Sequence, residues 1–119
     1  MQIRFPLILD GATGTELQKR GYKGDVSAEQ WVLEHPESII DVQTGYVAAG
    51  SQVLYAPSFG ANRRKLEEHG IFNRTADYNR RLAELSKRAA DGKALVAGDI
   101  SPTGLFLSPL GEASFEELV

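Results

Sequence analysis

The sequence predicts an α/β fold in which short parallel strands alternate with crossover helices. Three apolar runs, at residues 7–9, 52–56 and 94–98, are rich in Val, Leu or Ile and lack regular alternation. This composition is typical of strands buried on both faces. Helical patterns separate the runs, which gives the order strand, helix, strand, helix, strand. The runs begin about 44 residues apart, a longer spacing than the roughly 30 residues per unit of a plain (β/α)8 barrel.

The helix predicted between the first two main strands covers residues 37–49. Pro36 suits its first position, and Gly50 suits its end. The apolar residues that repeat along it at helical spacing are Ile39, Val42, Tyr46 and Ala49. One apolar face of this kind indicates a helix that packs on a sheet.

Two helices are predicted before the last strand. The shorter covers residues 63–69 and ends at Gly70. The longer covers residues 77–90, with basic residues on its outer faces. Its predicted core positions are Tyr78, Leu82, Leu85 and Ala89.

Small polar side chains and glycines follow each predicted strand, in the segments LDGATG, YAPSFGAN and AGDISPTG. The loops after parallel strands gather on one face of the sheet, where ligands bind. We therefore expect these loops to form one site. The polar residues they bring are Asp10, Thr13, Ser58, Asn62, Asp99, Ser101 and Thr103.

The segment DGATGTE allows two interpretations. Thr13 and Glu16 fit a capping box at the start of a helix. Free N–H groups there would suit a carboxylate, and Asp10 would suit an ammonium group, as in a free amino acid. Plain capping, with Asp10 in a structural hydrogen bond, explains the same spacing. Asn62 is similarly ambiguous, because it fits either a helix cap or a group that points into a site.

Composition excludes several other classes of function. The net charge of −3 gives no reason to expect nucleic acid, and the absence of cysteine excludes thiolate metal sites within the chain. His35 and His69 stand at predicted helix boundaries without partners at ligand spacing. No apolar run approaches the roughly 18 residues of a membrane span, so a cytoplasmic protein is the expectation.

Four segments together resemble the homocysteine S-methyltransferase family: LDGATGTEL, W.LEHPE, YVAAGSQVLYAPSFGANRRKL and VAGDISPTG. The resemblance covers nearly the whole chain and is closest to the N-terminal homocysteine-binding domain of bacterial cobalamin-dependent methionine synthases. It implies a (β/α)8 barrel that binds zinc and homocysteine, with zinc lowering the thiol pKa so that a thiolate attacks the methyl donor. The family's zinc ligands are three cysteines that this chain lacks.

The resemblance also assigns roles within this sequence. Asp10 would hold the homocysteine amino group, and the backbone of Gly11, Ala12 and Thr13 would take its carboxylate. The residues of the second loop that would line the pocket include Ser58, Phe59 and Asn62. The family usually has Asn-Thr-Phe where this chain has Pro-Ser-Phe at 57–59, which keeps the hydroxyl and removes an amide.

The chain reaches Val119 inside SFEELV, where Ser114 and Glu117 fit another capping box. We therefore expect the first three βα units of the barrel, inactive alone. The expected partners are the rest of the barrel, cobalamin and folate domains, or other copies of the chain. Two alternatives are a small non-enzymatic α/β module and a component of a corrinoid-dependent demethylase.

Overall fold

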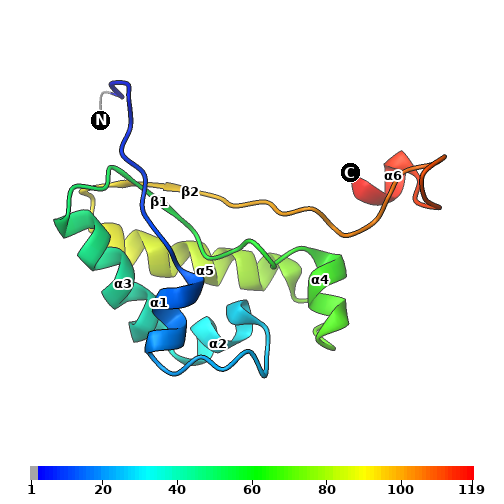
Figure 1. Ribbon diagram of the computed structural model, residues 1–119, viewed down its shortest axis with the longest axis horizontal. Helices are drawn as coiled ribbons and strands as arrows, with labels where there is room; N and C mark the ends of the chain where they lie inside the picture. The colour runs from blue at the N-terminus through cyan, green and yellow to red at the C-terminus, as the bar shows by residue number, and fades with distance from the viewer. Residues whose placement is uncertain (1–2) are drawn as a thin grey trace.

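The computed structural model describes residues 3–119 and contains a parallel sheet with its large helices on one side (Figure 1). Strand β1 (Val53–Tyr55) pairs in parallel with β2 (Leu95–Ala97), in the register Val53 to Leu95 and Tyr55 to Ala97. Leu9 forms a parallel bridge with Val53 on the other side of β1. The predicted order of three parallel segments is therefore confirmed, with β1 in the middle.

The first segment differs from the prediction, because it pairs through one bridge and forms no strand. Gln52 and Val53 donate their N–H groups to the Ile8 carbonyl at 2.7 and 3.2 Å, and the Asp10 N–H donates to the Val53 carbonyl at 3.0 Å. The expected burial on both faces is also wrong for this segment, since Ile8 and Leu9 are 60% and 45% exposed. Leu7, by contrast, is partly buried.

Helices α3 (Pro36–Ala48) and α5 (Thr75–Ala90) form the layer beneath the strands. Both match their predicted positions, and the four core positions expected along α5 are all buried. Gly50 follows α3 with φ +110°, a conformation that suits glycine, and so ends the helix as predicted.

Two short helices precede α3. Helix α1 (Gly14–Lys19) follows the loop of residues 10–13, called the Asp10 loop below. Helix α2 (Ala28–Glu34) lies in a segment for which the sequence predicted no helix. The Ser27 hydroxyl caps α2 by accepting the Gln30 N–H at 3.1 Å. Trp31 and Val32 are buried and join the core between α2, α3 and α5.

The remaining helices are α4 (Arg63–Glu68) and α6 (Phe115–Leu118). Helix α4 begins and ends close to its predicted bounds, and His69 is its C-terminal boundary residue. The predicted capping box of Ser114 and Glu117 is present at α6, which an extended segment holds away from the helical layer (Figure 1). Across residues 3–119, no helix combines the length and apolar character needed to cross a membrane.

Candidate functional site

The three loops that follow the parallel segments meet at one edge of the sheet, as predicted. Asp10 Oδ2 accepts the Tyr55 N–H at 3.0 Å, which ties the end of the first segment to the end of β1. The Ser58 hydroxyl donates to the Asp99 carbonyl at 2.9 Å and lies 3.2 Å from the Asp99 N–H. These bonds link Asp10, Ser58 and Asp99 through the strand ends.

Burial, hydrogen bonds and a nearby charge all act on the carboxyl group of Asp10. Burial raises the pKa of Asp10, although hydrogen bonds from the Tyr55 N–H and from its own N–H lower it. The nearby negative charge of Asp99 raises the pKa further. A positively charged group bound here would relieve both unfavourable effects. Asp10 therefore has a structural hydrogen bond, and its carboxyl group is partly buried near a second negative charge.

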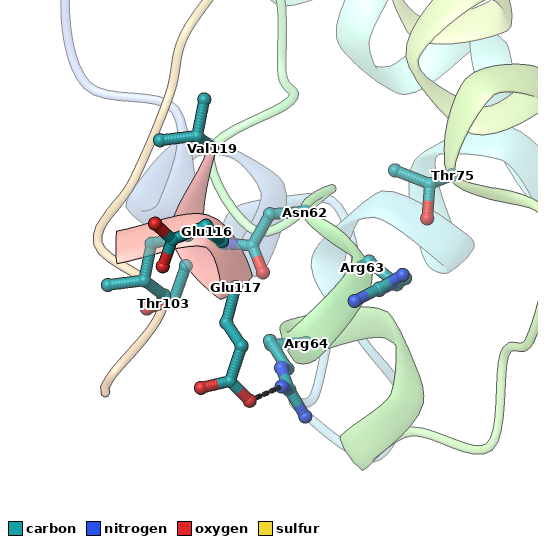
Figure 2. Close-up of a pocket in the computed structure, with 9 residues that line it drawn as sticks. Asn62, Arg63, Arg64, Thr75, Thr103, Glu116, Glu117 and Val119 are labelled. Carbon is teal, nitrogen blue, oxygen red and sulfur yellow. Dashed lines mark hydrogen bonds and ion pairs between the residues drawn. The ribbon is translucent and has the colours of Figure 1, made fainter. Parts of the chain in front are cut away.

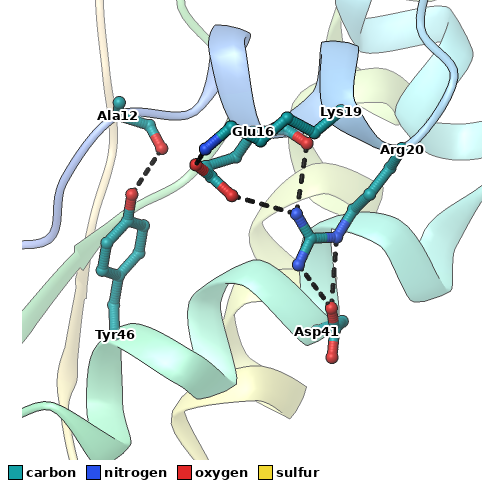
Figure 3. Close-up of polar contacts among 6 residues, drawn as sticks. All are labelled: Ala12, Glu16, Lys19, Arg20, Asp41 and Tyr46. Carbon is teal, nitrogen blue, oxygen red and sulfur yellow. Dashed lines mark hydrogen bonds and ion pairs between the residues drawn. The ribbon is translucent and has the colours of Figure 1, made fainter.

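A side chain from α3 fixes the loop after Asp10 (Figure 3). The Tyr46 hydroxyl donates to the Ala12 carbonyl at 2.7 Å. A Cβ atom at Gly11 would lie only 2.8 Å from Tyr46 Cε1, so the close approach of ring and loop requires glycine at this position. The backbone of Gly11, Ala12 and Thr13 is thus tied to α3 beside Asp10 by this bond.

The predicted capping box at Thr13 is wrong. Thr13 has helical backbone angles, φ −105° and ψ −52°, and its side chain caps no N–H group. A capping residue needs extended backbone to aim its oxygen at the next turn. Glu16 instead pairs with Lys19 at 2.6 Å and Arg20 at 3.1 Å, and Arg20 continues to Asp41 (Figure 3). Lys19 at the end of α1 and Arg20 directly after it therefore bind the carboxylate that the capping box would need.

Asn62 has the capping role, and it also contacts the third loop. Its Oδ1 accepts the Lys65 N–H at 2.9 Å and so caps α4. Its Nδ2 donates to the Ser101 hydroxyl at 3.1 Å. The two interpretations of Asn62 are therefore compatible, since one amide caps a helix and joins two loops of the site.

Two pockets lie along the second loop. The first has a volume of about 240 Å³ and an apolar floor from α1 and α2. The second has a volume of about 280 Å³ and lies toward α4 and α5. Phe59 and Asp99 line both. Of the predicted site residues, the first pocket contains Thr13, Phe59 and Asp99, and the second contains Ser58, Phe59, Asn62, Asp99 and Ser101. Asp10, Gly11 and Ala12 are not among the lining residues of either pocket.

A larger pocket of about 470 Å³ lies away from the Asp10 loop, between α4, the start of α5 and α6 (Figure 2). Arg64 on its α4 side pairs with Glu117 of α6 at 3.4 Å. Thr103, one of the polar residues predicted for the site, lines this pocket instead. The predicted residues are therefore divided between neighbouring cavities.

Three functional candidates were not predicted from the sequence: Glu29, Gln43 and Tyr46. Glu29 is buried on α2 and accepts the Gly60 N–H at 2.7 Å. Gln43 is buried on α3 and donates to the Tyr55 carbonyl at 2.8 Å. The pattern Ser27-x-x-Gln30 would have indicated α2, but nothing in the sequence indicates these long-range contacts.

The zinc ion implied by the resemblance does not fit the residues present. Residues 3–119 contain no group of three His, Asp, Glu or Cys side chains placed to hold a metal ion. The sequence has no cysteine, and its two histidines, His35 and His69, stand at helix boundaries. We therefore assign no metal ligand in this part of the chain.

Comparison with known proteins identifies the family. The family model of homocysteine S-methyltransferase matches residues 7–119. Betaine–homocysteine S-methyltransferase 1 of Rattus norvegicus is 33% identical over 123 residues, covering 94% of this chain and 29% of the relative. S-methylmethionine–homocysteine S-methyltransferase of Pongo abelii is 31% identical over 114 residues, covering 94% of this chain and 30% of the relative.

The fold leads to the same family. The metallated form of the homocysteine methyltransferase MmuM from Escherichia coli superposes with a TM-score of 0.73 at 31% identity. The match covers 82% of this chain and 38% of the MmuM chain, so the sequence spans well under half of the proteins it resembles. The strand ends, the Asp10 loop and these matches agree, and the chain belongs to the homocysteine S-methyltransferase family.

Proposed function

We propose that the protein binds homocysteine at the Asp10 edge of the sheet and takes part in its methylation to methionine. The observation that carries this proposal is the Asp10 carboxylate, which lies half-buried at the end of the first parallel segment in a member of this family. Its environment disfavours an isolated negative charge, so an ammonium group is a suitable partner.

The neighbouring loops complete the proposed site. The backbone of Gly11, Ala12 and Thr13, which Tyr46 holds in place, would receive the homocysteine carboxylate. The second loop supplies its wall through Ser58, Phe59 and Asn62 around the two smaller pockets. The carbon chain and sulfur would then extend over an apolar surface.

In the proposed reaction, a bond forms between the homocysteine sulfur and the methyl carbon while the bond from that carbon to the donor breaks. The thiol releases its proton. The residues described here bind and orient homocysteine, and no catalytic role is assigned to them. Zinc finds no ligand set among residues 3–119, so its ligands would come from outside this sequence.

We further propose that the three parallel segments are the first strands of a (β/α)8 barrel. The supporting observations are their sequential order, the helices on one face, and apolar side chains exposed on the segment around Ile8 and Leu9. Consecutive side chains of a strand point to opposite faces, so in a barrel one of the two would face the interior and the other would lie under the surrounding helices.

The methyl donor is a separate part of the proposal. The resemblance favours the cobalamin-dependent methionine synthases, in which a cobalamin domain carries the methyl group. The two curated relatives are named for betaine and S-methylmethionine. The donors can be distinguished by measuring methionine formation by the protein at its natural length (the natural protein), with methylcobalamin, betaine or S-methylmethionine supplied in turn. Turnover with methylcobalamin is the expected result.

Calorimetry with the natural protein tests homocysteine binding itself. We expect L-homocysteine to bind at least about tenfold more tightly than γ-mercaptobutyrate, which lacks the amino group. The difference reports the charge-assisted contact with Asp10. Equal affinities would show that no carboxylate recognises the ammonium group and would contradict the proposed site.

A further inference from the structure

Glu29 joins helix α2 to the loop that follows β1. Its side chain is buried, and Oε1 accepts the Gly60 N–H at 2.7 Å. The same residue lines the 240 Å³ pocket together with Phe59 and Asp99. A bond of this length from an N–H group to a carboxylate is typical of a strong, charge-assisted hydrogen bond.

This carboxylate has no cationic partner among residues 3–119. None of the ion pairs in that part of the chain includes Glu29. A buried carboxylate is costly unless hydrogen bonds or charges compensate it. The contact with the Gly60 backbone is therefore the main compensation that the structure provides.

The residue at position 60 is adapted to this contact. A Cβ atom there would lie 2.7 Å from Glu29 Oε1 and 2.9 Å from Oε2, well inside van der Waals contact. The carboxylate and the loop can approach this closely only because residue 60 is glycine. Glu29 and Gly60 thus form a matched pair from two elements 31 residues apart in the sequence.

The loop is anchored on its other side by Ser58. The Ser58 hydroxyl donates to the Asp99 carbonyl at 2.9 Å, at the end of β2. Phe59 lies between these two anchors with 59% of its surface exposed, and it lines both smaller pockets. Because the Phe59 side chain is exposed and forms part of the pocket walls, its position depends on the backbone on either side of it.

We propose that Glu29 is a positioning residue that holds residues 58–60 and thereby fixes the Phe59 wall of the homocysteine site. The proposal rests on the proposed function for its substrate, but the contact itself is independent of any ligand. Glu29 acts through the Gly60 N–H and need not touch homocysteine.

The test uses the natural protein with Glu29→Ala, Glu29→Asp and Glu29→Gln. The control is Glu34→Ala, which removes an exposed carboxylate from the same helix. Amide hydrogen exchange of Gly60, measured without ligand, should rise about tenfold or more in the Ala and Asp variants. The Gln variant retains an acceptor oxygen and should exchange nearly as slowly as the unaltered protein, as should the control.

Homocysteine affinity is measured on the same variants. We expect the Kd to rise about tenfold in Glu29→Ala and to change less than about threefold in Glu29→Gln. Glu29→Asp keeps the charge but withdraws the carboxylate by one methylene, and it replaces Glu29→Ala in the comparison if the latter does not fold.

Two results would overturn the proposal. Unchanged Gly60 exchange in a folded Ala or Asp variant would show that the contact does not hold the loop. Faster exchange with an unchanged homocysteine Kd would show that the loop position does not matter for the site. If the unaltered protein does not bind homocysteine, the proposed function is overturned instead. The Gly60 exchange measurement needs no ligand, so it tests the contact between Glu29 and Gly60 independently of that result.

Discussion

Substitution of Gly11 by alanine tests how strictly the Asp10 loop is packed against α3. The added Cβ would lie 2.8 Å from Tyr46 Cε1 and 2.9 Å from the Tyr46 hydroxyl oxygen. Ordinary contacts begin near 3.4 Å, so the ring or the loop must move by about half an ångström or more. Overpacking of a core costs about 1–3 kcal/mol, but Gly11 is exposed and the clashing atoms are at the free end of the Tyr46 side chain, so we expect about 1 kcal/mol, including the loss of the Tyr46–Ala12 hydrogen bond.

Urea unfolding of the natural protein measures this cost, and the Tyr46→Ala background assigns it to one contact. With the ring removed, Gly11→Ala should cost less than about 0.5 kcal/mol. Gly45→Ala is the matched control, because its Cβ would meet nothing within 4 Å and alanine favours the interior of α3. Equal costs for Gly11→Ala in the two backgrounds would refute the proposed clash with Tyr46.

Three further predictions concern a helix cap, a titration and an association. Asn62→Ala should lower the free energy of unfolding by about 1–2 kcal/mol, whereas Asn62→Asp keeps the cap and can accept the Ser101 hydroxyl in place of donating to it, so it should lose less; equal losses in urea unfolding would contradict this. Because the pKa of Asp10 is raised above 3.8, homocysteine affinity should be full above that raised pKa and fall as pH drops through it. The sign for the ligand-free fold is opposite: the stabilisation from the neutral Asp10 carboxyl is lost as pH rises through the same pKa. Calorimetry of Asp10→Asn across pH should lack the contribution of Asp10 to both changes, whereas the other carboxyl groups still titrate. Residues 1–119 expressed alone should self-associate through the open sheet edges at residues 7–9 and 95–97, so a compact monomer at every concentration in sedimentation would contradict this prediction.

The sequence predicts the covering helices well, because their apolar residues repeat with the helical period. Tyr78 and Leu82 lie on the buried face of α5 where spacing places them, and Gly50 ends α3 through its backbone freedom. The order of the parallel segments was also predictable, since short connections place consecutive units side by side. These features depend on local pattern and connectivity.

The sequence predicts contacts between elements poorly. The pattern Thr-x-x-Glu suggests a capping box at Thr13, but it cannot show that Lys19 and Arg20 compete for Glu16. The Leu7–Leu9 run has the composition of a buried strand, yet its burial depends on what covers it. Local pattern does not determine which partner a side chain meets.

The site shows the same division. Asp10 and Ser58 are predictable because they follow strands, and the structure brings both to one edge. Tyr46 and Glu29 are not, because each contacts a loop more than 30 residues away in the sequence. Only folded backbone reveals that Gly11 accommodates the tyrosine ring.

Homocysteine affinity of Asp10→Ala in the natural protein tests the central proposal most directly. Loss of a charge-assisted hydrogen bond to the ammonium group should weaken binding by roughly 1.5–3 kcal/mol, about tenfold to over a hundredfold in Kd by calorimetry. Zinc content should stay unchanged, and Asp25→Ala, at an exposed position before α2, should bind normally. An unaltered Kd in a folded Asp10→Ala variant would show that Asp10 only ties the first segment to β1, and it would contradict the proposed homocysteine site.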